Sequence, residues 1–105
     1  QERLSIAVSA MGGAQRAFDE AVKFTKERKA FGKTVFEFQN SKFTLADLAA
    51  KLQVGWAHLD WAIKRHLAGE LTTGEASAAK LWHTEMQWEM VDAALQLHGG
   101  AGYMN

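Results

Sequence analysis

The sequence predicts an all-α protein, and three observations support this class. None of the 105 residues is proline, and 48% are hydrophobic, with many alanine and leucine residues that favour helix. Apolar residues recur at alternating three- and four-residue steps over three long segments, as on one face of a helix. Short glycine-containing stretches separate these segments. We therefore expect three helices near residues 3–29, 40–67 and 73–97, running up, down and up without a sheet.

The first predicted helix carries one apolar stripe, which a pair of glycines interrupts. The stripe consists of Leu4, Ala7, Met11, Ala14, Phe18, Ala21 and Thr25. Gly12 and Gly13 each cost about 1 kcal/mol relative to alanine in a helix. A close helix crossing, a ligand against the backbone or poor local order would explain them. Lys26, Arg28 and Lys29 suit the negative end of the helix dipole, which is the simplest reading of this basic cluster.

The second predicted helix follows a connector over residues 30–40, in which Gly32 is the expected stop of the first helix. Gly69 marks the end of the second helix. Its apolar stripe consists of Leu45, Ala49, Leu52, Trp56, Leu59, Ile63 and His66.

The third predicted helix begins with a capping box from Thr72 to Glu75 and has two apolar faces. One face consists of Met86, Met90, Ala93 and Leu97, and the other of Leu81, Trp88 and Leu95. A helix with two apolar faces needs neighbours on both sides. We therefore expect one face to stay open in the chain alone and to favour self-association, most simply as a homodimer.

Composition excludes several classes of function. Twelve basic residues balance twelve acidic ones, so no net field favours nucleic acid or an anionic membrane. The lack of cysteine excludes disulfides and thiolate metal sites. No apolar run approaches the roughly 20 residues that a transmembrane helix needs. No second histidine follows His58, His66 or His83 at four residues, so we expect no metal site.

Two glycine-containing runs carry most of the functional information, one from Arg28 to Lys33 and one from Gln96 to Tyr103. The first ends a helical pattern with basic residues, an aromatic ring and a glycine, and the second ends one with three glycines. Helix ends, glycines and positive charge together allow an anionic ligand to approach backbone N–H groups closely.

At these two runs, and over nearly all of its length, the chain resembles the C-terminal domain of the flavin-dependent acyl-CoA dehydrogenases. The run from Gln1 to Leu4 together with Gln96 to Gly100 is most similar to the long-chain branch. The resemblance implies one domain over residues 1–105, a four-helix bundle without its last helix. An N-terminal helical domain and a middle β-domain would complete the active site. We expect the sequence to be a piece of a longer protein and to be inactive by itself.

The resemblance implies a catalytic role for Glu2. These enzymes need a carboxylate that removes a proton from the carbon next to the thioester in a water-poor pocket. The long-chain and isovaleryl branches place a glutamate directly before an arginine at the start of the first bundle helix. Glu2 and Arg3 match this pair, which would place Arg3 at the substrate. Most other branches supply the base from a loop beyond the position of Asn105, and a glutamate also simply favours a helix N-terminus, so these alternatives stay open.

The resemblance also implies FAD as the cofactor. Arg28 matches an arginine that grips the FAD pyrophosphate, a task that suits the bidentate guanidinium. Phe31 matches an aromatic residue against the cofactor, and Gln39, after Phe38, matches a polar contact with the adenosine part. The run from Gln96 to Gly100 matches a segment that lines the FAD of a neighbouring subunit. The expected cofactor set is Arg28, Lys29, Ala30, Phe31, Phe38, Gln39, Gln96, Leu97, His98, Gly99 and Gly100.

Two of these assignments have simpler alternatives. His98 also suits the negative end of a helix without any ligand. Tyr103 either lies near the acyl pocket or is an ordinary turn residue.

The resemblance implies an acyl-CoA substrate, an electron-transfer partner and a homo-oligomer, either a dimer or a tetramer. It implies a location in the bacterial cytoplasm or the mitochondrial matrix. The alternative, from a different class, is a free-standing helical interaction module. Such a module would need neither Arg28 nor the glycine-rich end.

Overall fold

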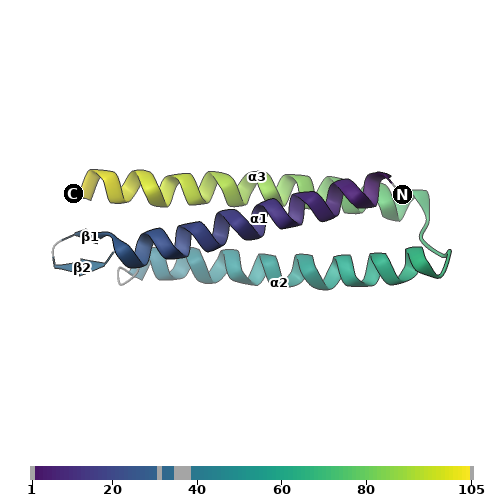
Figure 1. Cartoon of the computed structure of the whole chain (residues 1–105), viewed down its shortest axis with the longest axis horizontal. Helices are drawn as coiled ribbons and strands as arrows, with labels where there is room; N and C mark the ends of the chain where they lie inside the picture. The colour runs from purple at the N-terminus through teal and green to yellow at the C-terminus, as the bar shows by residue number, and fades with distance from the viewer. Residues whose placement is uncertain (1, 31, 35–38, 105) are drawn as a thin grey trace.

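The computed structural model describes residues 2–30, 32–34 and 39–104, and the described part is a bundle of three long helices. Helix α1 spans Glu2–Glu27, α2 spans Gln39–Leu67 and α3 spans Thr73–Met104. Figure 1 shows the helices side by side, with α1 and α3 running in one direction and α2 in the other, in a rod of 55 × 17 × 16 Å. The expected all-α, up-down-up architecture is confirmed.

The core lies along one face of α1, where the predicted stripe is confirmed. Leu4, Ala7, Met11 and Ala14 are buried, and Phe18 packs against them half-buried. The interface with α3 is the most extensive of the three helix pairs. From α3 this core takes Ala79, Met86 and Met90, and from α2 it takes Leu48, Leu52, Leu59 and Ala62.

The stripe predicted for α2 is wrong at about half of its positions. Ala49, Trp56, Ile63 and His66 are exposed, whereas Leu48, Gly55 and Ala62 are buried together with Leu45, Leu52 and Leu59. The reason is the size of the side chains at the contact. A Cβ on Gly55 would lie 2.7 Å from Met11 Sδ and 3.2 Å from the ring of Trp82, so α2 packs through its smallest residue.

The second apolar face of α3 is open within the chain, as expected from its pattern. Leu81 is 60% exposed, Trp88 75% and Leu95 64%. The first face is buried through Met86 and Met90. In the described residues, no helix has the length and apolar character needed to cross a bilayer.

The expected end of α3 near Leu97 is wrong, since the helix continues through Gly99 and Gly100 to Met104. Glycine lowers helix stability by about 1 kcal/mol but does not prevent helical dihedral angles. Among the described glycines only Gly32 and Gly69 have a positive φ, of 80° and 74°, so those two mark turns.

The connector after α1 contains a short β-ladder, so the expectation of no sheet is wrong for these four residues. Strand β1, Lys29–Ala30, pairs antiparallel with β2, Lys33–Thr34. The capping box of α3 is present as expected. The backbone N–H of Thr72 donates to Glu75 Oε1 at 2.9 Å, and the N–H of Glu75 donates to Thr72 Oγ1 at 3.1 Å.

Of the explanations for the glycine pair of α1, close packing applies to Gly13. A Cβ at Gly13 would overlap the amide of Gln87, which therefore lies across the α1 backbone. Gly12 faces open space, with no atom within 4 Å of an added Cβ.

This difference gives a prediction for Gly12→Ala and Gly55→Ala. Both changes gain the same helix propensity, about 1 kcal/mol. Only Gly55→Ala forces a methyl group against the fully buried Met11, and overpacking a core costs about 1–3 kcal/mol. In urea unfolding, Gly12→Ala should raise the free energy of unfolding. Gly55→Ala should have a free energy of unfolding about 1–3 kcal/mol lower than that of Gly12→Ala. Equal stability of the two variants would contradict the close approach of α2 to Met11.

Candidate functional site

The two glycine-containing runs meet at one end of the bundle. Helix α1 ends there at Glu27, Arg28 follows it directly, then β1 and β2, and α3 ends beside them (Figure 1). Strand β1 contacts α3, and the rings of Phe24 and His98 lie with centroids 3.9 Å apart. Residues separated by most of the sequence therefore form one surface at this end.

Arg28 is exposed at this surface and rests on the ring of Phe24. Its Cζ lies 5.3 Å from the ring centroid, within the range of a cation–π contact. None of the ion pairs found among the described residues involves Arg28. The guanidinium donors are therefore available to an anion as far as these residues are concerned.

His98 is held by its own helix. Its Nδ1 lies 2.7 Å from the carbonyl oxygen of Ala94. A carbonyl oxygen only accepts, so Nδ1 carries the proton and donates to it. The ring of His98 is thereby fixed against Phe24, half-buried between α1 and α3.

These residues fit a dinucleotide such as FAD at this end. The Arg28 guanidinium could donate two N–H groups to a pyrophosphate, and glycines at positions 99 and 100 have no side chain that would block a close approach. Gln96 is exposed, and its amide donates to Asp92 Oδ2 at 3.1 Å on the same helix. Leu97 is half-buried beside it.

The other residues of the expected cofactor set belong to the connector after α1 and to the start of α2. Phe31 and Phe38 lie outside the described residues. Lys29 and Ala30 are described as the backbone of β1, and Gln39 as the first residue of α2. All three lie at the same end of the bundle as Arg28.

Phe24 is a residue that the sequence analysis missed as part of this surface. It lies four residues before Arg28, a spacing that places two residues on the same face of a helix. The contact between Phe24 and Arg28 could therefore have been predicted from the sequence. The contact between Phe24 and His98 could not, because it joins two helices far apart in sequence.

Glu2 is the first residue of α1, and this end of α1 lies at the opposite end of the bundle (Figure 1). Glu2 lines a groove between α1 and α3. The groove has a volume of about 350 Å³ and is lined by Glu2, Ser5, Ile6, Ser9, Ala10, Thr84 and Gln87. Glu2 and Arg3 are exposed. Within one chain, therefore, the structure does not bring Glu2 together with Arg28 and His98.

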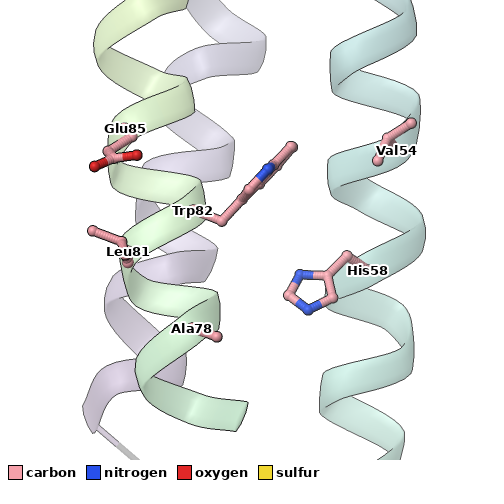
Figure 2. A pocket seen from close by; sticks show the side chains of 6 residues that line it. All are labelled: Val54, His58, Ala78, Leu81, Trp82 and Glu85. Carbon is pink, nitrogen blue, oxygen red and sulfur yellow. The ribbon is translucent and has the colours of Figure 1, made fainter. Parts of the chain in front are cut away.

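A third cluster lies on the face between α2 and α3. A groove of about 510 Å³ there is lined by Val54 and His58 of α2 and by Ala78, Leu81, Trp82 and Glu85 of α3. In Figure 2, His58 extends from α2 toward α3. Trp82 reaches into the space between the two helices. The groove adjoins the open apolar face of α3, because Leu81 belongs to both.

His58 in this groove is paired with a fully buried histidine. His58 Nδ1 lies 2.9 Å from His83 Nε2, and the ring of Trp82 lies edge-on to His83 at 4.8 Å. Burial, reinforced by His58, lowers the pKa of His83 to about 4. Among the described residues, no group of three or more histidine or carboxylate side chains could hold a metal ion.

Comparisons with known proteins agree with the resemblance noted in the sequence. The family model described as acyl-CoA dehydrogenase, C-terminal domain, matches residues 1–105. Mitochondrial long-chain specific acyl-CoA dehydrogenase of Mus musculus is 41% identical over 104 residues, which are 99% of this chain and 24% of that protein. A subunit of the caffeyl-CoA reductase–Etf complex of Acetobacterium woodii is 41% identical over 102 residues, 97% of this chain and 27% of that protein.

A solved structure gives the same result for the fold. The crystal structure of acyl-CoA dehydrogenase from Geobacillus kaustophilus superposes with a TM-score of 0.92 and 43% identity, covering 100% of this chain and 28% of that one. The chain thus spans about a quarter of the length of the curated relatives it matches.

The buried histidine predicts a pH-dependent stability. The pKa of His83 lies near 6.5 when unfolded and about 4 when folded, so the unfolded state binds the proton first. The stability that comes from keeping His83 neutral is fully present above about pH 6.5. As the pH falls, the free energy of unfolding decreases through His83, by about 3 kcal/mol at pH 4. His83→Gln should remove this part of the pH dependence, measured by urea unfolding at pH 7 and pH 4. His66→Gln, which changes an exposed histidine, should leave it intact, and equal pH profiles for all three chains would contradict the prediction.

Proposed function

This chain belongs to the family of acyl-CoA dehydrogenase C-terminal domains. We therefore propose that it is the cofactor-contacting helical domain of such an enzyme. Residues 1–105, which the family model matches, would form this single domain. The complete gene product would introduce a double bond between the α and β carbons of a fatty acyl-CoA thioester. The family match along residues 1–105 favours this function over a free-standing interaction module.

The observation that carries the proposal is the surface made by Arg28, Phe24 and His98 beside the glycines of α3. When bound, FAD accepts the hydride that leaves the β carbon. Arg28 would hold its pyrophosphate through paired N–H donors. Lys29, Ala30, Phe31, Phe38 and Gln39 would extend this contact toward the adenosine, with Gln96, Leu97, Gly99 and Gly100 on the α3 side.

Glu2 is the proposed base. Its groove between α1 and α3 would lie beside the acyl group, so that the carboxylate removes the α proton while Arg3 contacts the substrate. Glu2 is exposed in this chain, and the other domains of the enzyme would exclude water around it.

The separation of the two ends supports a homo-oligomer, a dimer or a tetramer. The 26 residues of α1 span about 39 Å at 1.5 Å per residue. Glu2 would act on the acyl group beside the flavin ring, and we take this separation to be too long for the pyrophosphate of the same FAD to reach Arg28 of the same chain. Arg28 and the α3 end would therefore serve the FAD of a neighbouring subunit, whose own Glu2 acts at the flavin.

The relatives support the remaining parts of the proposal. One relative is named as part of a complex with Etf, which supports an electron-transfer partner for the complete enzyme. Relatives named as mitochondrial and relatives from bacteria support a location in the mitochondrial matrix or the bacterial cytoplasm.

The first prediction concerns the cofactor. Arg28→Ala in the complete gene product should purify with little flavin, because the pyrophosphate loses its bidentate partner. The ratio of flavin to protein absorbance measures this. Arg16→Ala removes an exposed cation from the middle of the same helix and should keep its flavin. Normal flavin content in Arg28→Ala would return Arg28 to the role of an ordinary helix-end charge.

The second prediction concerns the base. Glu2→Gln should lower kcat by about 10²-fold or more while CoA-ester binding persists, because an amide keeps the shape of the carboxylate without its basicity. Steady-state kinetics and a binding titration separate the two effects. Glu20→Gln, an exposed glutamate on the same helix, is the matched control. Retained turnover in Glu2→Gln would assign the base to a different carboxylate.

The third prediction concerns self-association of the chain. Covering Leu81, Trp88 and Leu95 gains about 1.5–3 kcal/mol for each side chain, so two copies should pair through α3. Light scattering after gel filtration, over a dilution series, should detect the dimer. Trp88→Lys should shift it toward monomer, and Leu67→Lys, an equally exposed residue at the end of α2, should not. A monomer at every concentration would contradict pairing through this face.

A further inference from the structure

The side chains of Arg28, Phe24 of α1 and His98 of α3 are in contact at the end of the bundle where α1 and α3 finish. The guanidinium carbon of Arg28 lies 5.3 Å from the centroid of the Phe24 ring, and the Phe24 ring lies 3.9 Å from the ring of His98 at an interplanar angle of 39°. Arg28 is exposed, whereas Phe24 and His98 are half-buried. The two rings therefore lie inward of the charge.

Both the backbone and the side chain of Arg28 contact Phe24. The N–H of Arg28 donates to the carbonyl oxygen of Phe24 at 3.0 Å, which is the last helical bond at the end of α1. The guanidinium returns over the ring of the same residue. An arginine at a helix end otherwise samples many rotamers, and an aromatic face restricts them.

Phe24 in turn is fixed by His98. The Nδ1–H of His98 donates to the carbonyl oxygen of Ala94 at 2.7 Å, which orients the imidazole ring on α3. Because His98 belongs to α3, its ring connects the end of α3 with the end of α1. The orientation of Arg28 thus depends on a residue of the glycine-rich run.

We infer that Phe24 and His98 are positioning residues, whose rings hold the guanidinium of Arg28 in the orientation that receives the cofactor phosphates. The inference rests on the proposed function, because it takes Arg28 to be the phosphate contact. It assigns a role to Phe24 and gives His98 the role of a ring rather than a charge. A phenylalanine at position 98 would keep the ring contact with Phe24 without the hydrogen bond to Ala94.

The test is a titration of FAD into the flavin-free form of the complete gene product. Phe24→Leu and His98→Leu keep apolar volume and remove a ring, and each should raise the Kd for FAD about tenfold. Phe24→Tyr and His98→Phe keep a ring and should bind within about twofold of the parent protein. In the Arg28→Ala background, Phe24→Leu should add less than about twofold, because the two residues act through one contact.

Trp61→Leu is the matched control. Trp61 of α2 carries a similar contact, with the Cζ of Arg65 lying 5.4 Å from its ring, at the other end of the bundle. Its loss should leave the Kd for FAD unchanged. Thermal unfolding of each flavin-free variant identifies any that fails to fold. If Phe24→Leu fails, His98→Leu carries the test, with Arg28→Ala/His98→Leu as the double variant.

The outcomes separate this inference from the proposed function. Weaker FAD binding in the ring-deleted variants, rescue by Tyr and Phe, and loss of the effect without Arg28 support it. An unchanged Kd in the folded ring-deleted variants, with weak binding in Arg28→Ala, overturns the inference and leaves the proposed function intact. An equal effect of Phe24→Leu with and without Arg28 also overturns it. An unchanged Kd in Arg28→Ala overturns the role proposed for Arg28, and the inference with it.

Discussion

The register between α1 and α3 is the constraint on which the rest of the structure depends. These two helices run in the same direction, and their contact is the most extensive in the bundle. Gly13 lies opposite Gln87, and Phe24 lies opposite His98, at the same separation along the chain. Both helices rise by about 1.5 Å per residue, so one register satisfies both contacts. A shift of one turn would separate Phe24 from His98 and place the amide of Gln87 against a side chain.

Helix α2 completes the core, but its interfaces with α1 and α3 are less extensive than the interface between those two helices, and it packs through the small residue Gly55. Gly55 allows Met11 and Trp82 close to the α2 backbone, and His58 pairs with the buried His83. The imidazole pair satisfies one nitrogen of His83 within the protein, while the low polarity around the ring keeps it neutral. Leu81 and Trp82 then leave an open apolar groove on the side away from α1 (Figure 2). The packing that buries Met86 and Met90 of α3 leaves Leu81, Trp88 and Leu95 exposed on its other face.

The long, narrow shape of the bundle has a consequence for the proposed chemistry. A phosphate contact at one end and a base at the other cannot serve one cofactor within one chain, because α1 separates them by its full length. Assembly of subunits would resolve this, since the end of one bundle then completes the site of another. The open face of α3 is observed, whereas the two ends of the site are proposed; assembly of subunits would accommodate both.

The sequence by itself determined the helices, the capping box and the stripe of α1, because helix periodicity and capping depend on residues three or four apart. It also determined which runs carry Arg28, His98 and Glu2, and the family that these runs resemble. The buried face of α2, the pairing of His58 with His83 and the contact of Phe24 with His98 were decided only by tertiary structure. Each joins different helices, where the size of Gly55 and the helix register select the partners. The continuation of α3 through Gly99 and Gly100 also escaped the local rules, because the cost of a glycine in a helix is small enough for the rest of the helix to offset.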